Sequence, residues 1–122
     1  MITAAIALHR NDEYRIDAYG IALYNADGTP YAIASVHETK PIGVNAAIYA
    51  ALAQIAEILR EYDGKLFVTS REWIFKQPGR LRQALTNADV SYIYSRQAPH
   101  CDEALDLAED AARRKTTIIE KF

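Results

Sequence analysis

Three side chains of the sequence have types that could act as a nucleophile or as metal ligands: Ser70, His100 and Cys101. A serine nucleophile needs a base close by, and no base is positioned by the sequence around Ser70. We therefore interpret Ser70 as a polar residue at a turn between a strand and a helix. His100 and Cys101 could form a metal or thiol site, but zinc needs further ligands at suitable spacing. The other two histidines, His9 and His37, lie far away in the sequence.

A second group of side chains combines positive charge with an aromatic ring, which favours nucleic acid as a partner. Its members are Arg71, Trp73, Lys76, Arg80, Arg82 and Arg96. The cations could contact phosphates, and the indole of Trp73 could pack against a sugar. The alternative is a solvated basic face with Trp73 in the core.

Two of the eight tyrosines, Tyr92 and Tyr94, share one face of a predicted strand. If this strand lies at the edge of its sheet, it could pair with a second copy of the chain or with another protein. The alternative is ordinary half-buried packing, in which each buried hydroxyl needs a hydrogen-bond partner.

Length and composition predict one soluble domain that spans residues 1–122. The chain has 50% hydrophobic and 25% charged residues, which excludes disordered and fibrous classes. No apolar stretch approaches the roughly 20 residues of a membrane helix, and no basic segment precedes a signal-like apolar run. A single cysteine fits a reducing cytoplasm, and the net charge of -2 argues mildly against a dedicated nucleic-acid binder.

The elements that must position these residues can be read from hydrophobic patterns. Apolar runs at 3–9, 18–25 and 31–37 predict three strands, and Asp27-Gly28 predicts a hairpin between the last two. From Val44 the apolar spacing becomes helical and continues to Asp63-Gly64, with Asn45 as a possible cap. Residues 65–69 predict a buried parallel strand.

The second half of the chain adds short helices, one strand and a final helix. Thr69 and Glu72 have the spacing of a capping box, followed by a short helix before Pro78-Gly79 and another over 80–85. Residues 90–95 predict the last strand. A helix from Asp102 carries acids at its start and bases at its end, which complements the helix dipole. The whole predicts an α/β fold with a mixed five-stranded sheet covered by helices.

In the order of these predicted elements and in several local motifs, the chain resembles the ribonuclease H family. Four stretches resemble family motifs in the same order, at residues 19–23, 45–52, 69–77 and 104–112. The resemblance covers almost the whole chain. It implies the sheet order 3-2-1-4-5, in which the second strand is antiparallel to the others. It also implies cleavage of the RNA strand of RNA–DNA hybrids by two Mg²⁺ ions held on four carboxylates.

The four carboxylates that this resemblance implies are absent from the sequence. Their positions are occupied by Leu8 or His9, Ile48, Ser70 and Leu105. Asp12 and Asp106 lie near two of these positions, but a shift of one residue on a helix turns a side chain by about 100°. The loop histidine of the family corresponds to Ala98, with His100 close by. We therefore expect no two-metal nuclease site, no cofactor and no metal.

Three functions of different class remain open. The first is an inactive ribonuclease H-like module that binds hybrid or duplex nucleic acid through its basic face. The second is a protein-interaction or scaffold domain without a role in nucleic acid. The third is a divergent active ribonuclease H, in which displaced acids such as Asp12, Glu72 and Asp106 would hold Mg²⁺. The fold alone does not choose among them.

Overall fold

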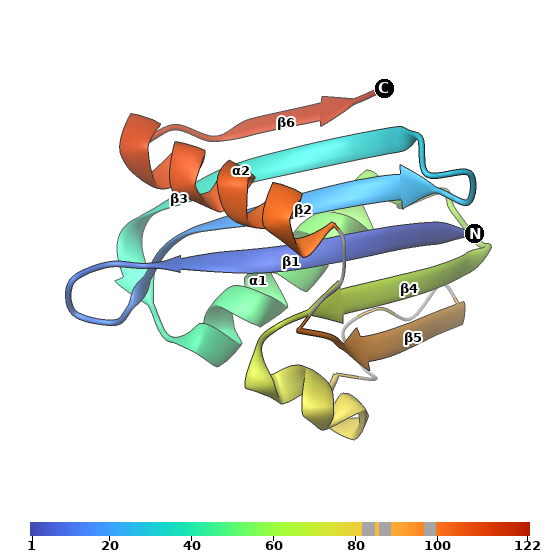
Figure 1. Cartoon of the computed structure of the whole chain (residues 1–122), viewed down its shortest axis with the longest axis horizontal. Coiled ribbons are helices and arrows are strands. Elements are labelled where there is room, and N and C mark those ends of the chain that lie inside the picture. The colour runs from blue at the N-terminus through green and yellow to red at the C-terminus, as the bar shows by residue number, and fades with distance from the viewer. Residues whose placement is uncertain (82–84, 86–88, 97–99) are drawn as a thin grey trace.

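The computed structural model describes residues 1–81, 85, 89–96 and 100–122. Its strands are β1 (Ile2–Arg10), β2 (Ile16–Asn25), β3 (Pro30–Ile42), β4 (Lys65–Ser70), β5 (Asp89–Tyr94) and β6 (Ile118–Lys121). Its helices are α1 (Val44–Ile58) and α2 (Cys101–Arg114), with the 3₁₀ helices η1 (Trp73–Lys76) and η2 (Pro78–Arg80) after β4. The strands form a mixed sheet in the order β5-β4-β1-β2-β3-β6 (Figure 1).

The sheet confirms the predicted order of the first five strands and adds a sixth. β1, β2 and β3 form an antiparallel meander, whereas β4 runs parallel to both β1 and β5. The prediction of five strands was wrong because the chain after α2 returns to the sheet. There β6 pairs antiparallel with β3, from Ala32 opposite Lys121 to Ser35 opposite Ile118.

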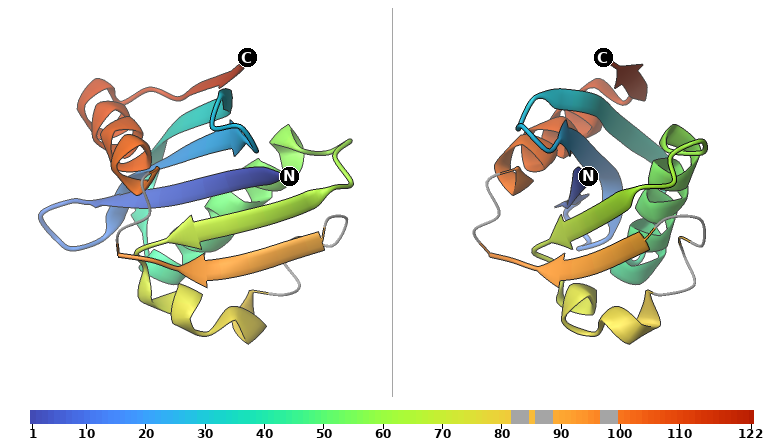
Figure 2. Two further views of the ribbon diagram at one scale, coloured as in Figure 1. Left: turned by 45° about the vertical axis from the view of Figure 1, so that its right-hand side comes forward. Right: turned by 90° about the vertical axis from the view of Figure 1, so that its right-hand side faces the viewer.

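Helix α2 packs on one face of the sheet against unusually small residues (Figure 2). Ala7, Gly20 and Ser35 lie side by side on β1, β2 and β3. A Cβ atom on Gly20 would come within 1.9 Å of the carbonyl oxygen of Ala104. The hydroxyl of Ser35 donates a hydrogen bond of 2.6 Å to the carbonyl oxygen of Leu107. The row of small residues therefore lets the helix backbone approach the sheet closely.

Helix α1 covers the opposite face, where the main core lies. Large aliphatic side chains from the strands meet the apolar stripe of the helix there, including Ile6, Ile21, Leu23, Ile48, Leu52 and Ile55. The predicted helical stripe is thus confirmed, although α1 ends at Ile58 rather than at Asp63-Gly64. Its N-cap is Gly43 and not Asn45, and no side chain caps it.

Two further local predictions differ from the structure. β3 extends to Ile42, past the expected end at residue 37. Thr69 and Glu72 do not form a capping box, because Thr69 still belongs to β4 and η1 begins only at Trp73. The hydroxyl oxygen of Thr69 is instead buried without a hydrogen-bond partner among the described residues.

The remaining helices agree with expectation in part. The charges at the two ends of α2 complement the helix dipole, as predicted: Asp102 and Glu103 lie in its first turn, and Arg113 and Arg114 lie in its last. The short helix predicted over 80–85 falls partly on residues 82–84, outside the described residues, and η2 ends at Arg80. Within the described part of the chain, no helix is long and apolar enough to cross a membrane.

Candidate functional site

The positions where carboxylates were expected lie on β1, α1, β4 and α2. Because β1 and β4 are parallel neighbours, with Ile6 opposite Ser70, their carboxyl ends lie at the same edge of the sheet. A cavity of about 180 Å³ opens there. It is lined by Ile6, Ala7, Leu8, Arg10, Arg71, Glu72, Cys101 and Leu105. The fold thus brings Leu8 and Leu105 together, in a cavity with mainly apolar walls.

The other two expected positions are buried and do not line this cavity. Ile48 is completely enclosed in the main core. The Ser70 hydroxyl donates a hydrogen bond of 2.9 Å to the carbonyl oxygen of Ile6, and its oxygen accepts one of 3.3 Å from the backbone N–H of Glu72. Ser70 therefore fastens the end of β4 to β1, which agrees with its interpretation as a polar residue at a turn.

The charged residues around the cavity form two ion pairs that connect distant parts of the chain. Two nitrogens of Arg10 lie 2.6 and 3.3 Å from the two carboxylate oxygens of Glu72, whose side chain is only 14% exposed. A nitrogen of Arg71 lies 2.6 Å from a carboxylate oxygen of Asp102, which is 75% exposed. The carboxylates closest to the cavity are therefore already neutralised by guanidinium groups.

The residues present do not fit the Mg²⁺ ions that the resemblance implies. Mg²⁺ requires several oxygen ligands in octahedral geometry. Asp12 lies exposed in the turn after β1, Asp106 is exposed on α2, and Glu72 is held by Arg10. Among the residues the structure describes, no three His, Cys, Asp or Glu side chains are grouped so that they could hold a metal ion.

His9, His100 and Cys101 have separate surroundings and do not form one site. The Nδ1 atom of His9 lies 2.6 Å from an oxygen of Asp17. The ring of His100 stacks on Tyr24, with the two ring centroids 3.6 Å apart. Burial raises the pKa of the Cys101 thiol above its ordinary value, which favours the unreactive protonated form. The position of Ala98 lies outside the described residues.

The basic candidates differ in the partners that the described residues give them. Arg71 is engaged with Asp102, and Arg80 makes a weak hydrogen bond of 3.3 Å to Gln77. Arg82 lies outside the described residues. The other candidates gather where η1 lies beside the edge strand β5 (Figure 2). We call Trp73, Lys76, Tyr94 and Arg96 the β5-edge patch.

The β5-edge patch is an alternation of rings and cations. The Nζ atom of Lys76 lies 4.4 Å from the ring centroid of Trp73 and 4.6 Å from that of Tyr94. The Nε–H of Arg96 donates a hydrogen bond of 3.0 Å to the Tyr94 hydroxyl, which lowers the pKa of that hydroxyl below its usual range. The indole of Trp73 is 65% exposed, so the alternative that placed it in the core was wrong.

Tyr92 and Tyr94, the two tyrosines of the edge strand β5, are half-buried and pack against the core of the same chain. β5 does lie at an edge of the sheet. Tyr92 is half-buried and meets Phe75 edge to face, with the ring centroids 6.1 Å apart. Its hydroxyl is buried without a hydrogen-bond partner among the described residues, and burial raises its pKa to about 12. Pairing of the chain with a second copy remains a prediction.

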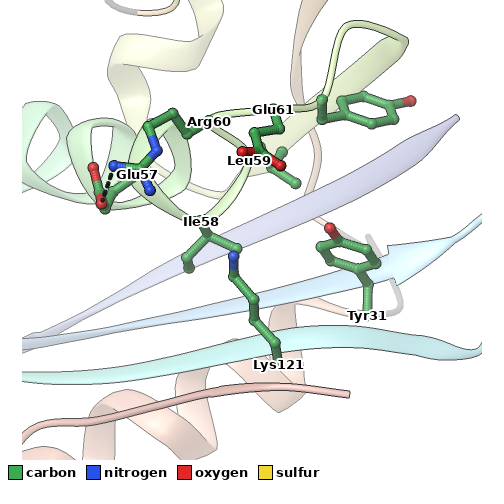
Figure 3. Close-up of a pocket in the computed structure, with 8 residues that line it drawn as sticks. Tyr31, Glu57, Ile58, Leu59, Arg60, Glu61 and Lys121 are labelled. Carbon is green, nitrogen blue, oxygen red and sulfur yellow. Dashed lines mark ion pairs between the residues drawn. The ribbon is translucent and has the colours of Figure 1, made fainter.

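A second cavity, of about 330 Å³, was missed because its wall includes the unpredicted strand β6. Figure 3 shows Lys121 of β6 extending toward Ile58 at the end of α1, with the ring of Tyr31 beside it. Glu57 and Arg60, which also line the cavity, form an exposed ion pair of 3.4 Å. These polar groups do not converge on one point, so the cavity does not define a catalytic arrangement.

Comparison with known proteins supports the fold and not a particular activity. The sequence matches no protein-family model, and no curated protein matches it significantly. The structure is similar to RNase H1 from the halophilic archaeon Halobacterium salinarum NRC-1, with a TM-score of 0.75 and 18% identity. That match covers 93% of this chain and 98% of the other.

A second similar structure is the N-terminal RNase H domain of rv2228c from Mycobacterium tuberculosis, solved as a fusion with maltose binding protein. The TM-score is 0.63 at 13% identity, with 89% of this chain and 96% of the other covered. The chain therefore has a ribonuclease H-like fold, as its sequence pattern predicted.

Proposed function

Because the chain has a ribonuclease H-like fold, we propose that it is a nucleic-acid-binding domain that does not hydrolyse its ligand by two-metal catalysis. The observation that carries this proposal is the cavity at the ends of β1 and β4. Where the resemblance expects carboxylates, its walls carry Leu8 and Leu105, and Glu72, the one carboxylate among the lining residues, is paired with Arg10.

The chemistry of this cavity supports the loss of metal-dependent hydrolysis. A two-metal site stabilises the charge of the attacking and leaving oxygens and needs several carboxylates that face one another. Here the nearest carboxylate, Glu72, accepts two hydrogen bonds from Arg10, and a second arginine, Arg71, lines the same cavity. Arg10 occupies the carboxylate oxygens that a divalent cation would need, and aliphatic walls offer it no ligand.

The case for nucleic acid rests on the fold and on the cations at the β5 edge. Both similar structures are RNases H. Within the described residues, Lys76 and Arg96 contact aromatic groups and form no ion pair with a carboxylate. Cations that are not paired within the protein can contact phosphates without first breaking an ion pair.

The test combines cleavage and binding on the same purified chain. An RNA–DNA hybrid is incubated with the protein in Mg²⁺ and then in Mn²⁺, with a known ribonuclease H as the positive control. We expect no cleavage above the buffer background. Binding of labelled hybrid, duplex and single strands at low salt should be measurable and should weaken as salt rises.

Two outcomes would contradict the proposal. Metal-dependent cleavage that disappears in Glu72→Gln would assign a divergent nuclease, because contamination would not respond to that substitution. Absence of binding to every nucleic acid at low salt would favour a protein-interaction domain. Light scattering on the same sample tests whether a second copy pairs through an edge strand. Cytoplasmic localisation also stays a prediction.

A further inference from the structure

The β5-edge patch has the composition of a site for unpaired nucleic-acid bases. Proteins that bind single strands commonly combine exposed aromatic rings, on which bases stack, with cations that follow the backbone. Trp73 supplies a ring that is 65% exposed although it is the largest apolar side chain of the protein. An indole of this size is ordinarily buried to a high degree, so its exposure calls for a ligand.

The contacts of the patch favour one arrangement of the Trp73 ring and leave most of the residue exposed. The Lys76 ammonium group lies between Trp73 and Tyr94, within 4.4 and 4.6 Å of their ring centroids. An ammonium group over a ring contributes about 0.5–1 kcal/mol at an exposed site, which favours one arrangement of the three side chains. The ring of Trp73 nevertheless stays mostly in solvent.

The charges of the patch favour a polyanion. Lys76 and Arg96 are two of the 14 basic residues of a chain whose net charge is -2, and both lie in this patch. Glu72 is close enough to influence Tyr94, but it is already bound to Arg10. The patch therefore offers two cations whose charge no adjacent free carboxylate offsets among the described residues. An acidic ligand gains from this arrangement, whereas a neutral apolar partner would not use it.

We infer that the β5-edge patch binds single-stranded nucleic acid, with an unpaired base stacked on Trp73 and phosphates beside Lys76 and Arg96. This inference rests on the proposed function and makes it more specific. A base in a hybrid or duplex stacks on its neighbours, so its faces are not available to the indole. Stacking also makes little distinction among bases, so recognition is expected to be largely independent of sequence.

The sole tryptophan of the chain makes the contact directly visible. Oligothymidylate is titrated into the protein, and quenching of the Trp73 fluorescence reports stacking. A phosphodeoxyribose oligomer of the same length without bases is the matched ligand control, since it carries the charge but cannot stack. We expect quenching and tight binding with oligothymidylate, and neither with the abasic oligomer.

Substitutions separate the aromatic from the electrostatic part, with affinities measured by anisotropy of labelled oligothymidylate. Trp73→Ala should weaken binding by about fivefold to 150-fold, because stacking contributes about 1–3 kcal/mol per base, and Trp73→Phe should retain most of the affinity. Phe122→Ala, which removes another exposed aromatic ring from the C-terminal end, should bind as the wild type does.

The salt dependence gives an independent count of the phosphate contacts. Two contacts on a single strand predict a slope of about -1.4 for the logarithm of affinity against the logarithm of salt concentration. Lys76→Gln should reduce the steepness by about 0.7, whereas Lys40→Gln, at an exposed lysine of β3, should leave it unchanged.

The outcomes distinguish this inference from the proposed function. If hybrid or duplex binds more tightly than single strands and Trp73→Ala has no effect, the inference is overturned while nucleic-acid binding stands. Equal binding of the abasic oligomer also overturns it, because charge alone would explain the contact. If no oligonucleotide of any kind binds at low salt, both are overturned, and the patch is better explained as a protein-docking surface.

Discussion

Gly20 of β2 lies so close to Ala104 of α2 that a methyl group on Gly20 would overlap the carbonyl oxygen of Ala104, at 1.9 Å. The same position would also come within 2.8 Å of the backbone nitrogen of Ala108. Both obstacles are backbone atoms of a regular helix, which cannot move aside as a flexible side chain can. The position of α2 on the sheet therefore depends on the absence of a side chain at residue 20.

We predict that Gly20→Ala lowers the free energy of unfolding by about 3 kcal/mol, the upper end of the usual effect of overpacking. Urea denaturation followed by circular dichroism measures the change. Gly79→Ala is the matched control, because a Cβ atom there meets nothing within 4 Å, and its effect should be within about 0.5 kcal/mol. Equal stability of the two variants would show that α2 does not pack as described.

The contact at Gly20 also shows how far the sequence could predict the fold. The apolar runs at residues 3–9 and 18–25 and the helical spacing after Val44 are local patterns, and each predicted the type and place of its element, although the ends differ by a few residues. The alternation of small with large residues, as in Ala5-Ile6-Ala7-Leu8, was also visible in the sequence. In the structure it separates the face under α2 from the face under α1.

Elements without such a pattern could not be predicted. β6 has four residues, of which only Ile118 is even half-buried, so no alternation marks it. The turn that leads to it begins at Lys115, in the left-handed conformation with φ of 58°, where glycine is the usual signal. Trp73 looked like a core residue by type, but η1 is too short for a periodic pattern to show which side chain faces solvent.

For the cavity at the ends of β1 and β4, the sequence predicted only the absence of the carboxylates that the family motifs carry. Comparison with the family motifs identified the positions of the missing carboxylates at Leu8 or His9, Ile48, Ser70 and Leu105. The Arg10–Glu72 pair joins residues 62 positions apart in the sequence, so no local pattern could indicate it. The partner of a charged side chain depends on the strand order and register, which follow from the fold as a whole.

A second prediction compares the Arg10–Glu72 ion pair with the more exposed Arg71–Asp102 pair. A double-mutant cycle with Arg10→Ala and Glu72→Ala should give a coupling energy of about 1–2 kcal/mol, since Glu72 is largely buried and bound by two nitrogens. The same cycle on Arg71 and Asp102 should give about 0–0.5 kcal/mol, because Asp102 is 75% exposed. Similar couplings in the two cycles would contradict the assigned burial.

A third prediction concerns Ile48, one of the two fully buried positions at which a carboxylate was expected. Ile48→Glu should destabilise the protein by at least about 3 kcal/mol, because it removes a core side chain and buries a carboxyl group without a partner. Ile48→Val, which keeps the site apolar, should lose only about 1 kcal/mol. Thermal unfolding with and without millimolar Mg²⁺ measures both. A raised melting temperature of Ile48→Glu in Mg²⁺ would show instead that the site can still bind a metal.

The fourth prediction uses the buried hydroxyl of Tyr92. The hydroxyl has no hydrogen-bond partner among the described residues, so it is desolvated without compensation. Tyr92→Phe removes only this group and keeps the ring against Phe75. At neutral pH the variant should therefore be as stable as the wild type or more stable, by up to about 1 kcal/mol. A marked loss of stability would show that the hydroxyl has a partner.

The alkaline pH dependence tests the same group independently. Burial raises the pKa of Tyr92 from 10.0 in the unfolded chain to about 12 in the folded one, so the unfolded chain releases this proton first as the pH rises. The stability of the wild type should fall between pH 10 and 12, and Tyr92→Phe should fall less steeply. Part of the fall remains because burial, together with Glu38, also raises the pKa of Tyr19 to about 12. Stability is measured by urea denaturation at several pH values across this range. Tyr14→Phe, a control at an exposed ring, should follow the wild-type dependence of stability on pH. If wild type, Tyr92→Phe and Tyr14→Phe all gave the same curve, the Tyr92 hydroxyl would lie in solvent.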